Sequence, residues 1–258
     1  SEMCIRDRFN MSAQISTGST NNSGTYSSAI GFQTSAVGDY STAMGYSTTA
    51  SASYCTAMGY ATTASGSTST AMGVNTTASG DGSTSLGNQT IASANNSSAM
   101  GASTTASGEV STAMGYATTA NGSTSTSMGL STTANGEVST AMGLGTTANG
   151  SVSVAMGRNT TASDYGSLVI GQYNSSGSTI TTSSTAFNTS NTAFVIGNGT
   201  LGNLSDAFKV MFNGDTSVSN NLTVMGDLEV QSDARLKSNI VSLGPTLSKI
   251  LQIDGKSY

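Results

Sequence analysis

The sequence contains no histidine, no tryptophan, a single proline and only two cysteines. Without histidine a Ser-His-Asp catalytic arrangement is excluded. Charge is scarce as well, because only 8% of the residues are charged and the formal net charge is −5. Few, dispersed acids leave no basic surface for nucleic acid or for an anionic membrane. We therefore expect neither nucleic acid binding nor membrane insertion.

Long apolar runs are also missing. No stretch of about 20 apolar residues is present, and no basic-then-apolar signal segment opens the chain. Residues 3–8 resemble the conceptual translation of a sequencing-adapter end, so residues 1–10 are expected to be non-native and residues 11–23 a short lead-in. That leaves Cys55 as a single cysteine, which supports neither a disulfide framework nor a zinc cluster.

What the chain does contain is serine, threonine, alanine, glycine and asparagine, arranged in a repeat. Such a composition is typical either of a disordered low-complexity chain or of a repeat protein. Two tracks recur every 14 residues without an insertion, which favours the repeat. The first, always followed by glycine, is Ile30, Met44, Met58, Met72, Leu86, Met100, Met114, Met128, Met142, Met156 and Ile170. The second is Ala36, Ala50, Ala64, Ala78, Ala92, Ala106, Ala120, Ala134, Ala148 and Ala162.

One copy of the repeat predicts two short strands. In residues 41–46 the alternation places Thr42, Met44 and Tyr46 on one side and Ala43 and Gly45 on the other. Residues 47–50 form a second extended piece, and turn-permissive pairs such as residues 65–66 and 121–122 follow in the same phase. The repeat therefore predicts an all-β solenoid in which each coil takes 14 residues.

We expect the residues of the first track to point inward and form a thin structural core together with alanine. A single coil with such a core is poorly stabilised at about 25 cal/mol per Å², which predicts self-association. A metal or redox role is less expected, because thioether sites usually recruit cysteine or histidine. The predicted core residues are Met44, Met58, Met72, Leu86, Met100, Met114, Met128, Met142 and Met156.

Residues 111–120, with the sequence STAMGYATTA, carry a resemblance to a known family. They are similar to the head repeats of YadA-like trimeric autotransporter adhesins, whose pattern runs S-V-A-I-G-x-x-A-x-A. The similarity spans about residues 24–171, and it implies a left-handed parallel β-roll in which three chains pack as a homotrimer. This chain departs in using methionine for isoleucine and threonine for valine, although Val154 is closer to the pattern.

The period is lost after Gly171. Residues 172–193 read as a linker rich in serine, threonine and asparagine, and residues 194–230 as a β-rich stalk. Strands are expected over residues 194–199, 207–212 and 216–218, with the turn Asn213-Gly214-Asp215 before the last of these. Residues 221–230 continue the same alternation and are also expected to be extended.

The last part of the chain, residues 231–258, carries a second motif. Residues 232–240, with the sequence SDARLKSNI, precede Pro245 and a helical spacing of apolar residues. They resemble the start of the endosialidase-type C-terminal intramolecular chaperone, a self-cleaving peptidase domain of phage tail fibres and some other trimeric surface proteins. That domain runs beyond the position of Tyr258, so we expect a truncated copy.

The second resemblance implies one catalytic site. It places a scissile bond between Gln231 and Ser232 and makes Ser232 the nucleophile with Lys237 as its base. A serine hydroxyl needs such a base, and a partly desolvated lysine with a lowered pKa can serve. The alternative is a capped helix entry with an exposed basic residue.

Together these patterns predict an extracellular structural subunit of a trimeric surface or phage tail fibre. It would mediate attachment to a host or cell-surface receptor, for example a glycan. The C-terminal chaperone domain would assist trimerisation and would then be released by autoproteolysis. Tyr46, Tyr60 and Tyr116 would form an aromatic receptor surface or cover the joints between coils. The alternative is a bacterial adhesin without self-cleavage.

Ice binding, glycan degradation and calcium binding are less expected for this sequence. An ice-binding solenoid needs a flat threonine array, which residues 68–70 fit and residues 110–112 break. A glycan-degrading enzyme needs paired carboxylates, whereas Glu109 and Glu137 lie two coils apart and are better explained as solvated edges. Asp39, Asp81 and Asp164 are too sporadic for calcium, and Cys55 replaces a serine of the repeat. No cofactor and no metal is expected.

Overall fold

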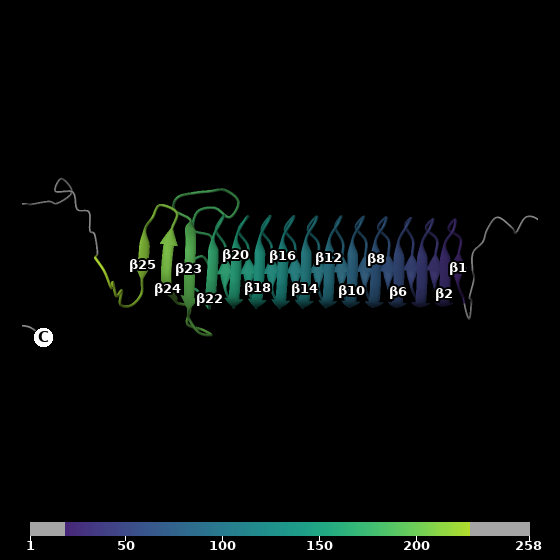
Figure 1. The fold of residues 1–258 in the computed structure, drawn as a ribbon, viewed down its shortest axis with the longest axis horizontal. Coiled ribbons are helices and arrows are strands. Elements are labelled where there is room, and N and C mark those ends of the chain that lie inside the picture. The colour runs from purple at the N-terminus through teal and green to yellow at the C-terminus, as the bar shows by residue number, and fades with distance from the viewer. Residues whose placement is uncertain (1–18, 228–258) are drawn as a thin grey trace, which may run out of the picture. The chain divides into compact units, whose positions relative to one another are not determined.

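The structure, a computed structural model, describes residues 19–227, and its strands wind into a two-sided parallel solenoid (Figure 1). Each coil contributes one five-residue strand to a 14-stranded sheet and one two-residue strand to an 11-stranded sheet. Strand-compatible threonine alternates here with alanine, and turns that tolerate small residues close each coil. The predicted all-β solenoid with 14-residue coils is thus confirmed.

The larger sheet holds the long strand of every coil. These strands are β2 (Ser28–Phe32), β4 (Thr42–Tyr46), β6 (Thr56–Tyr60), β8 (Thr70–Val74), β10 (Thr84–Asn88), β12 (Ser98–Ala102), β14 (Thr112–Tyr116), β16 (Thr126–Leu130), β18 (Thr140–Leu144), β20 (Val154–Arg158) and β22 (Leu168–Gln172). The smaller sheet consists of β1 (Asn21–Asn22), β3 (Ser35–Ala36), β5 (Thr49–Ala50), β7 (Thr63–Ala64), β9 (Thr77–Ala78), β11 (Ile91–Ala92), β13 (Thr105–Ala106), β15 (Thr119–Ala120), β17 (Thr133–Ala134), β19 (Thr147–Ala148) and β21 (Thr161–Ala162).

Neighbouring coils pair in register, so every repeat position becomes a column along the roll. Met44 lies opposite Met58 in the larger sheet, and Thr49 lies opposite Thr63 in the smaller one. Because adjacent strands are about 4.8 Å apart, equivalent side chains stack at that spacing.

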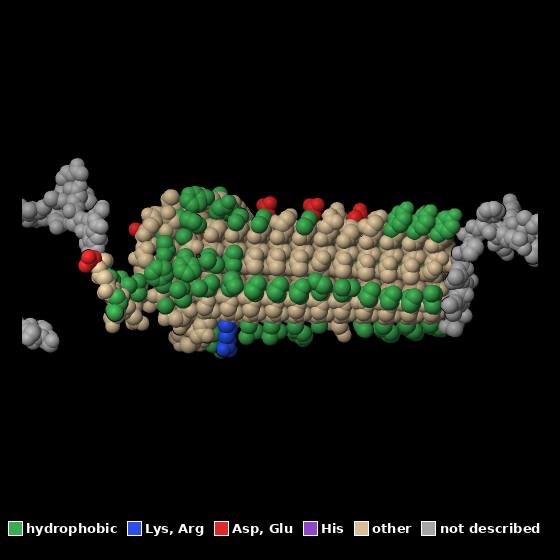
Figure 2. Space-filling model, in the orientation of Figure 1, with side chains coloured by type: hydrophobic (Ala, Val, Ile, Leu, Met, Phe, Trp, Pro, Cys, Tyr) green, Lys and Arg blue, Asp and Glu red, His purple; other side chains and the backbone are tan. Residues whose placement is uncertain are grey.

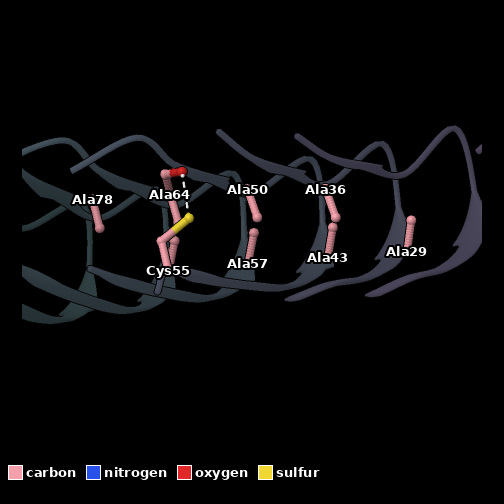
Figure 3. Packing of buried hydrophobic residues seen from close by; sticks show 9 residues of the cluster. Ala29, Ala36, Ala43, Ala50, Cys55, Ala57, Ala64 and Ala78 are labelled. Carbon is pink, nitrogen blue, oxygen red and sulfur yellow. Dashed lines mark hydrogen bonds between the residues drawn. The ribbon is translucent and has the colours of Figure 1, made fainter. Parts of the chain in front are cut away.

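The core inside the roll is made of alanine, serine and threonine. Ala43 and Ala50 are fully buried, as are their equivalents in most coils. Figure 3 shows that the side chains of Ala36 and Ala43 face one another across the interior, as do those of Ala50 and Ala57. The side chains between the two sheets are thus almost all small.

The methionine column does not form this core, and that prediction is wrong for the single chain. The alternation along each strand is as predicted, but its small-residue side faces inward and its methionine side faces outward. Met72 and Met156 are 39% and 38% exposed, and the other methionines of the column, with Leu86, are partly exposed. The narrow interior, rather than side-chain hydrophobicity, decides which side is buried.

Glycine is required where the coils approach most closely. Gly115 has a φ of 125°, and a β-carbon at this position would come within 2.1 Å of the carbonyl oxygen of Gly129 in the next coil. The same geometry recurs along the column, which explains why a glycine follows every residue of the first track.

Beyond β22 the larger sheet continues, although the repeat does not. Residues 173–191 form no strand, after which β23 (Thr192–Asn198) pairs in parallel with β22. The strands β24 (Asp206–Met211) and β25 (Thr216–Val218) then add in antiparallel order. Three of the expected strands are therefore confirmed.

The prediction that residues 221–230 are extended is wrong for residues 221–227, the part of this segment that the structure describes. Residues 221–227 contain no strand and are exposed. Residues 19–227 include no helix that is long and apolar enough to cross a membrane.

Candidate functional site

The outer face of the larger sheet carries the methionine column. A row of hydrophobic side chains runs along this face in Figure 2. From β2 to β18 no strand of this sheet contains a charged residue, and Arg158 at the end of β20 is the first. The opposite sheet instead turns threonine outward, as at Thr49 and Thr119. The two outer faces therefore differ, because the larger sheet adds a methionine column to its outward threonines, such as Thr42, and the smaller sheet has threonine without methionine.

Two ladders of aromatic rings lie on the edges of the first coils. Tyr26, Tyr40 and Tyr54 stack with centroid separations of 5.2 and 5.0 Å. Phe32, Tyr46 and Tyr60 stack at 5.3 and 5.2 Å along another column. Their rings bridge successive coils and remain exposed, so both roles considered for Tyr46 and Tyr60 fit this geometry.

Tyr116 occupies the same repeat position as Tyr46 and Tyr60 without a neighbouring ring. It is 59% exposed, with Ala102 and Leu130 beside it in register. It therefore forms no ladder of its own.

The acids of the roll share one edge position. Asp39, Asp81, Glu109 and Glu137 are all exposed and stand at the same place in their coils. Among residues 19–227 no group of three or more potential acidic or cysteine ligands is close enough to hold a metal ion. The carboxylates of Asp39 and Asp81 instead accept hydrogen bonds from the backbone amides of Thr25 and Ser67, one coil away.

Cys55 lies in the interior, where other coils place serine. Its thiol contacts the carbonyl oxygen of Ala52, as the hydroxyl of Ser97 contacts that of Ala94. Burial raises the pKa of the Cys55 thiol above its ordinary value, which lowers the thiolate fraction. The position is that of a structural side chain.

Asp164 closes the end of the roll. Its column carries glycine in most coils, because a β-carbon at Gly150, for example, would lie 2.1 Å from the carbonyl oxygen of Asp164. No further coil covers Asp164, so a larger side chain fits. Its buried carboxylate accepts hydrogen bonds from the amides of Thr181 and Thr192, at 2.6 and 2.8 Å, and from the Thr181 hydroxyl.

The segment held by Asp164 covers the last coil. The amides of Ser163 and Tyr165 donate to the carbonyl oxygens of Gly177 and Ser183, and the amide of Ser151 donates to that of Ser184. These bonds satisfy donors that a following coil would otherwise take. The segment is thus a cap on the open end of the solenoid.

A polar hollow of about 330 Å³ lies next to the cap, between the start of this segment and the strands β24 and β25. Its lining is Ser175, Ser176, Leu204, Ser205, Asp206, Lys209, Ser217, Val218 and Ser219. Lys209 and several serine hydroxyl groups line this depression together, and Lys209 and Ser217 also line a second depression beside it.

Sequence reasoning missed both Asp164 as a cap and the hollow around Lys209. The signal for Asp164 was an acid in a column otherwise occupied by glycine or alanine. The hollow had no local signal, because it depends on how β24 and β25 return against residues 175–176. The predicted catalytic residues Ser232 and Lys237, with Gln231, lie outside the described residues.

The fold and surfaces define a repeat protein of the parallel β-solenoid class. The sequence model of the YadA head domain repeat, which spans two copies of the repeat, matches overlapping segments that together cover residues 23–146 and 148–174. This is more than half of the chain, and the chain belongs to the YadA head repeat family. No curated protein matches it. The repeats mark it as an adhesin-like protein of a cell-surface or extracellular fibre.

Proposed function

We propose that this chain is one subunit of a homotrimeric fibre that mediates attachment, with the larger sheets of three rolls packed against one another. Membership of the YadA head repeat family supports this assembly, since heads of this kind form homotrimers in general. The observation that carries the proposal is the in-register methionine column on an uncharged outer face.

The energetic argument favours burial of that face. The interior of each coil buries alanine methyls and small hydroxyl side chains, which contribute little apolar area. Packing the methionines of three chains together would remove from water the largest apolar side chains that recur along the repeat. The smaller sheet, with threonine facing outward, would stay in solvent and remain available for contacts with a receptor.

Sedimentation equilibrium on a matched pair of variants tests this assembly. Met114→Glu places a charge on the methionine face, and Thr119→Glu places the same charge on the opposite face of the same coil. We expect the wild type and Thr119→Glu to be trimers and Met114→Glu to dissociate, with circular dichroism showing that each variant retains β-structure. A monomeric wild type, or a Met114→Glu trimer as stable as the wild type, would overturn the proposal.

We also propose that the fibre belongs to a phage tail or to a bacterial surface. A second part of the proposal is that Ser232 and Lys237 release the C-terminal domain by autoproteolysis. Both are supported by the motif in residues 232–240. The receptor is proposed to be a host or cell-surface molecule.

Ice binding remains a second candidate because of one observation. The threonine triplets considered from the sequence do not form a surface, since Ser69 and Ser111 are buried. The outer column of the smaller sheet is instead threonine in most coils, namely Thr49, Thr63, Thr77, Thr105, Thr119, Thr133, Thr147 and Thr161. We expect no thermal hysteresis from the assembled fibre; hysteresis that Thr119→Glu reduces would favour this candidate.

A further inference from the structure

The hollow beside the cap has one wall that is fixed by a single carboxylate. Asp206 accepts hydrogen bonds from the amide and hydroxyl of Ser175, at 2.8 and 2.7 Å, and from the amide of Ser176, at 2.6 Å. These bonds tie the segment after β22 to the start of β24. The hollow is therefore preorganised, and the Asp206 carboxylate is already engaged by three donors.

Of the other polar side chains in the hollow, the Ser219 hydroxyl donates to the carbonyl oxygen of Ala207, and the rest have no partner among residues 19–227. The ammonium of Lys209 and the hydroxyls of Ser176, Ser205 and Ser217 make no hydrogen bond or ion pair with other described residues. Lys209 and Ser217 are directly opposite each other on β24 and β25, so their side chains emerge on the same face. Leu204, which is exposed, adds an apolar patch to this lining.

We propose that this hollow binds a carboxylate-bearing sugar residue, such as a hexuronate, with the Lys209 ammonium on the carboxylate. This site would name the ligand class that the fibre recognises, and its biological role therefore rests on the proposed attachment function. The volume lies at the small end of ligand sites, which suits one sugar ring. The free serine hydroxyls match sugar hydroxyls as donors and acceptors, while Leu204 can pack against ring carbons.

The charge of the surroundings selects the kind of anion. Lys209 is the single cation lining the hollow, and the Asp206 carboxylate lines it as well. A dianionic phosphate would meet the Asp206 carboxylate with only the one positive charge of Lys209 to offset both anions. A monoanionic carboxylate is therefore favoured, and a neutral sugar would leave the ammonium without a partner.

Saturation-transfer NMR on the full chain tests the site with three probes: glucuronate, glucose as its neutral match, and inorganic phosphate. We expect glucuronate to bind, and Lys209→Gln to weaken its binding at least about tenfold, the loss expected for one charge-assisted hydrogen bond. Lys209→Arg should retain most of the binding. The control Arg158→Gln removes a cation outside the hollow and should leave binding unchanged.

Equal binding of glucose and glucuronate, tighter binding of phosphate, or an unchanged affinity in Lys209→Gln would overturn the assignment, as would no binding at all. Lys209 is half-buried, and circular dichroism of each variant confirms that the fold persists. Sedimentation of the same samples reports the subunit number independently. A monomer that binds glucuronate through Lys209 would contradict the proposed trimer alone, and a trimer that does not bind it would contradict this site alone.

Discussion

The hydroxyl oxygen of Ser127 lies 2.7 Å from that of Thr132 inside the roll, and Ser85 stands in the same relation to Thr90. In most coils alanine replaces this serine, as at Ala113, and the threonine hydroxyl, as at Thr118, is buried without a partner in the described chain. The same threonine position is therefore satisfied in some coils and unsatisfied in others.

This difference predicts opposite effects for one substitution at two sites. Thr118→Val removes a buried hydroxyl that has no partner, so the free energy of unfolding should rise by about 1 kcal/mol. Thr132→Val removes the partner of Ser127 and should lower it by about the same amount. Thermal denaturation followed by circular dichroism measures both. Equal shifts of the same sign would contradict the hydrogen-bond interpretation.

Val138 predicts a stabilising substitution in a turn. It adopts a φ of 56°, in the left-handed region that disfavours β-branched residues, while Gly82 and Gly166 occupy the same repeat position in other coils. Val138→Gly should relieve about 1–2 kcal/mol of strain, less about 0.5–1 kcal/mol of backbone entropy. The expected outcome in chemical denaturation is a small gain in stability.

The matched control is Val154→Gly, since Val154 lies in strand β20 and has no positive φ. There glycine loses strand propensity and side-chain packing, so stability should fall. Losses of similar size in both variants would show that the turn stores no strain.

Asp164→Ala predicts a local opening of the cap. The variant leaves the amides of Thr181 and Thr192 without their acceptor. Thr192 is buried, and leaving a buried donor unsatisfied costs about 1–3 kcal/mol, whereas the amide of the exposed Thr181 can bond to water. Hydrogen exchange at these two amides should become faster, while exchange at Thr119 in the middle of the roll should not change. Asp81→Ala, at an exposed acid that accepts one amide bond, is the control and should leave the cap unaffected.

Self-cleavage predicts a specific mass. If Ser232 is the nucleophile and Lys237 its base, the protein expressed from a gene that encodes the complete chaperone domain should split before Ser232. Denatured mass spectrometry should show the split in the wild type and an intact chain in both Ser232→Ala and Lys237→Met. If the wild type stays intact, residues 232–240 resemble the self-cleaving domain without sharing its activity. If Ser232→Ala is still cleaved, another residue is the nucleophile.

The solenoid fold could be predicted from the sequence because the same residue types recur every 14 residues. The spacing of Met44, Met58 and Met72 and of Ala36, Ala50 and Ala64 fixes coil length, strand number per coil and register together. A 14-residue spacing kept over so many copies is compatible with few other arrangements. Local alternation then correctly separated the two sides of each strand.

The sequence pattern did not show which side of each strand faces the interior of the roll. Hydrophobicity alone places Met114 inside and Ala113 outside, yet the interior between the two sheets is filled by small side chains such as those of Ala113 and Thr118. The cap and the hollow depend on contacts between residues far apart in the chain, such as Asp164 with Thr192 and Ser175 with Asp206. No local pattern encodes those pairs.

The unbroken register between coils also has a genetic consequence. Each coil between β2 and β22 contacts its neighbours through the same columns, so recombination between copies in equal phase adds or deletes whole coils without altering either end. Each such event would change the length of the roll by about 4.8 Å. Fibre reach can therefore evolve in unit steps while the aromatic first coils, the cap and the hollow beside it are inherited unchanged.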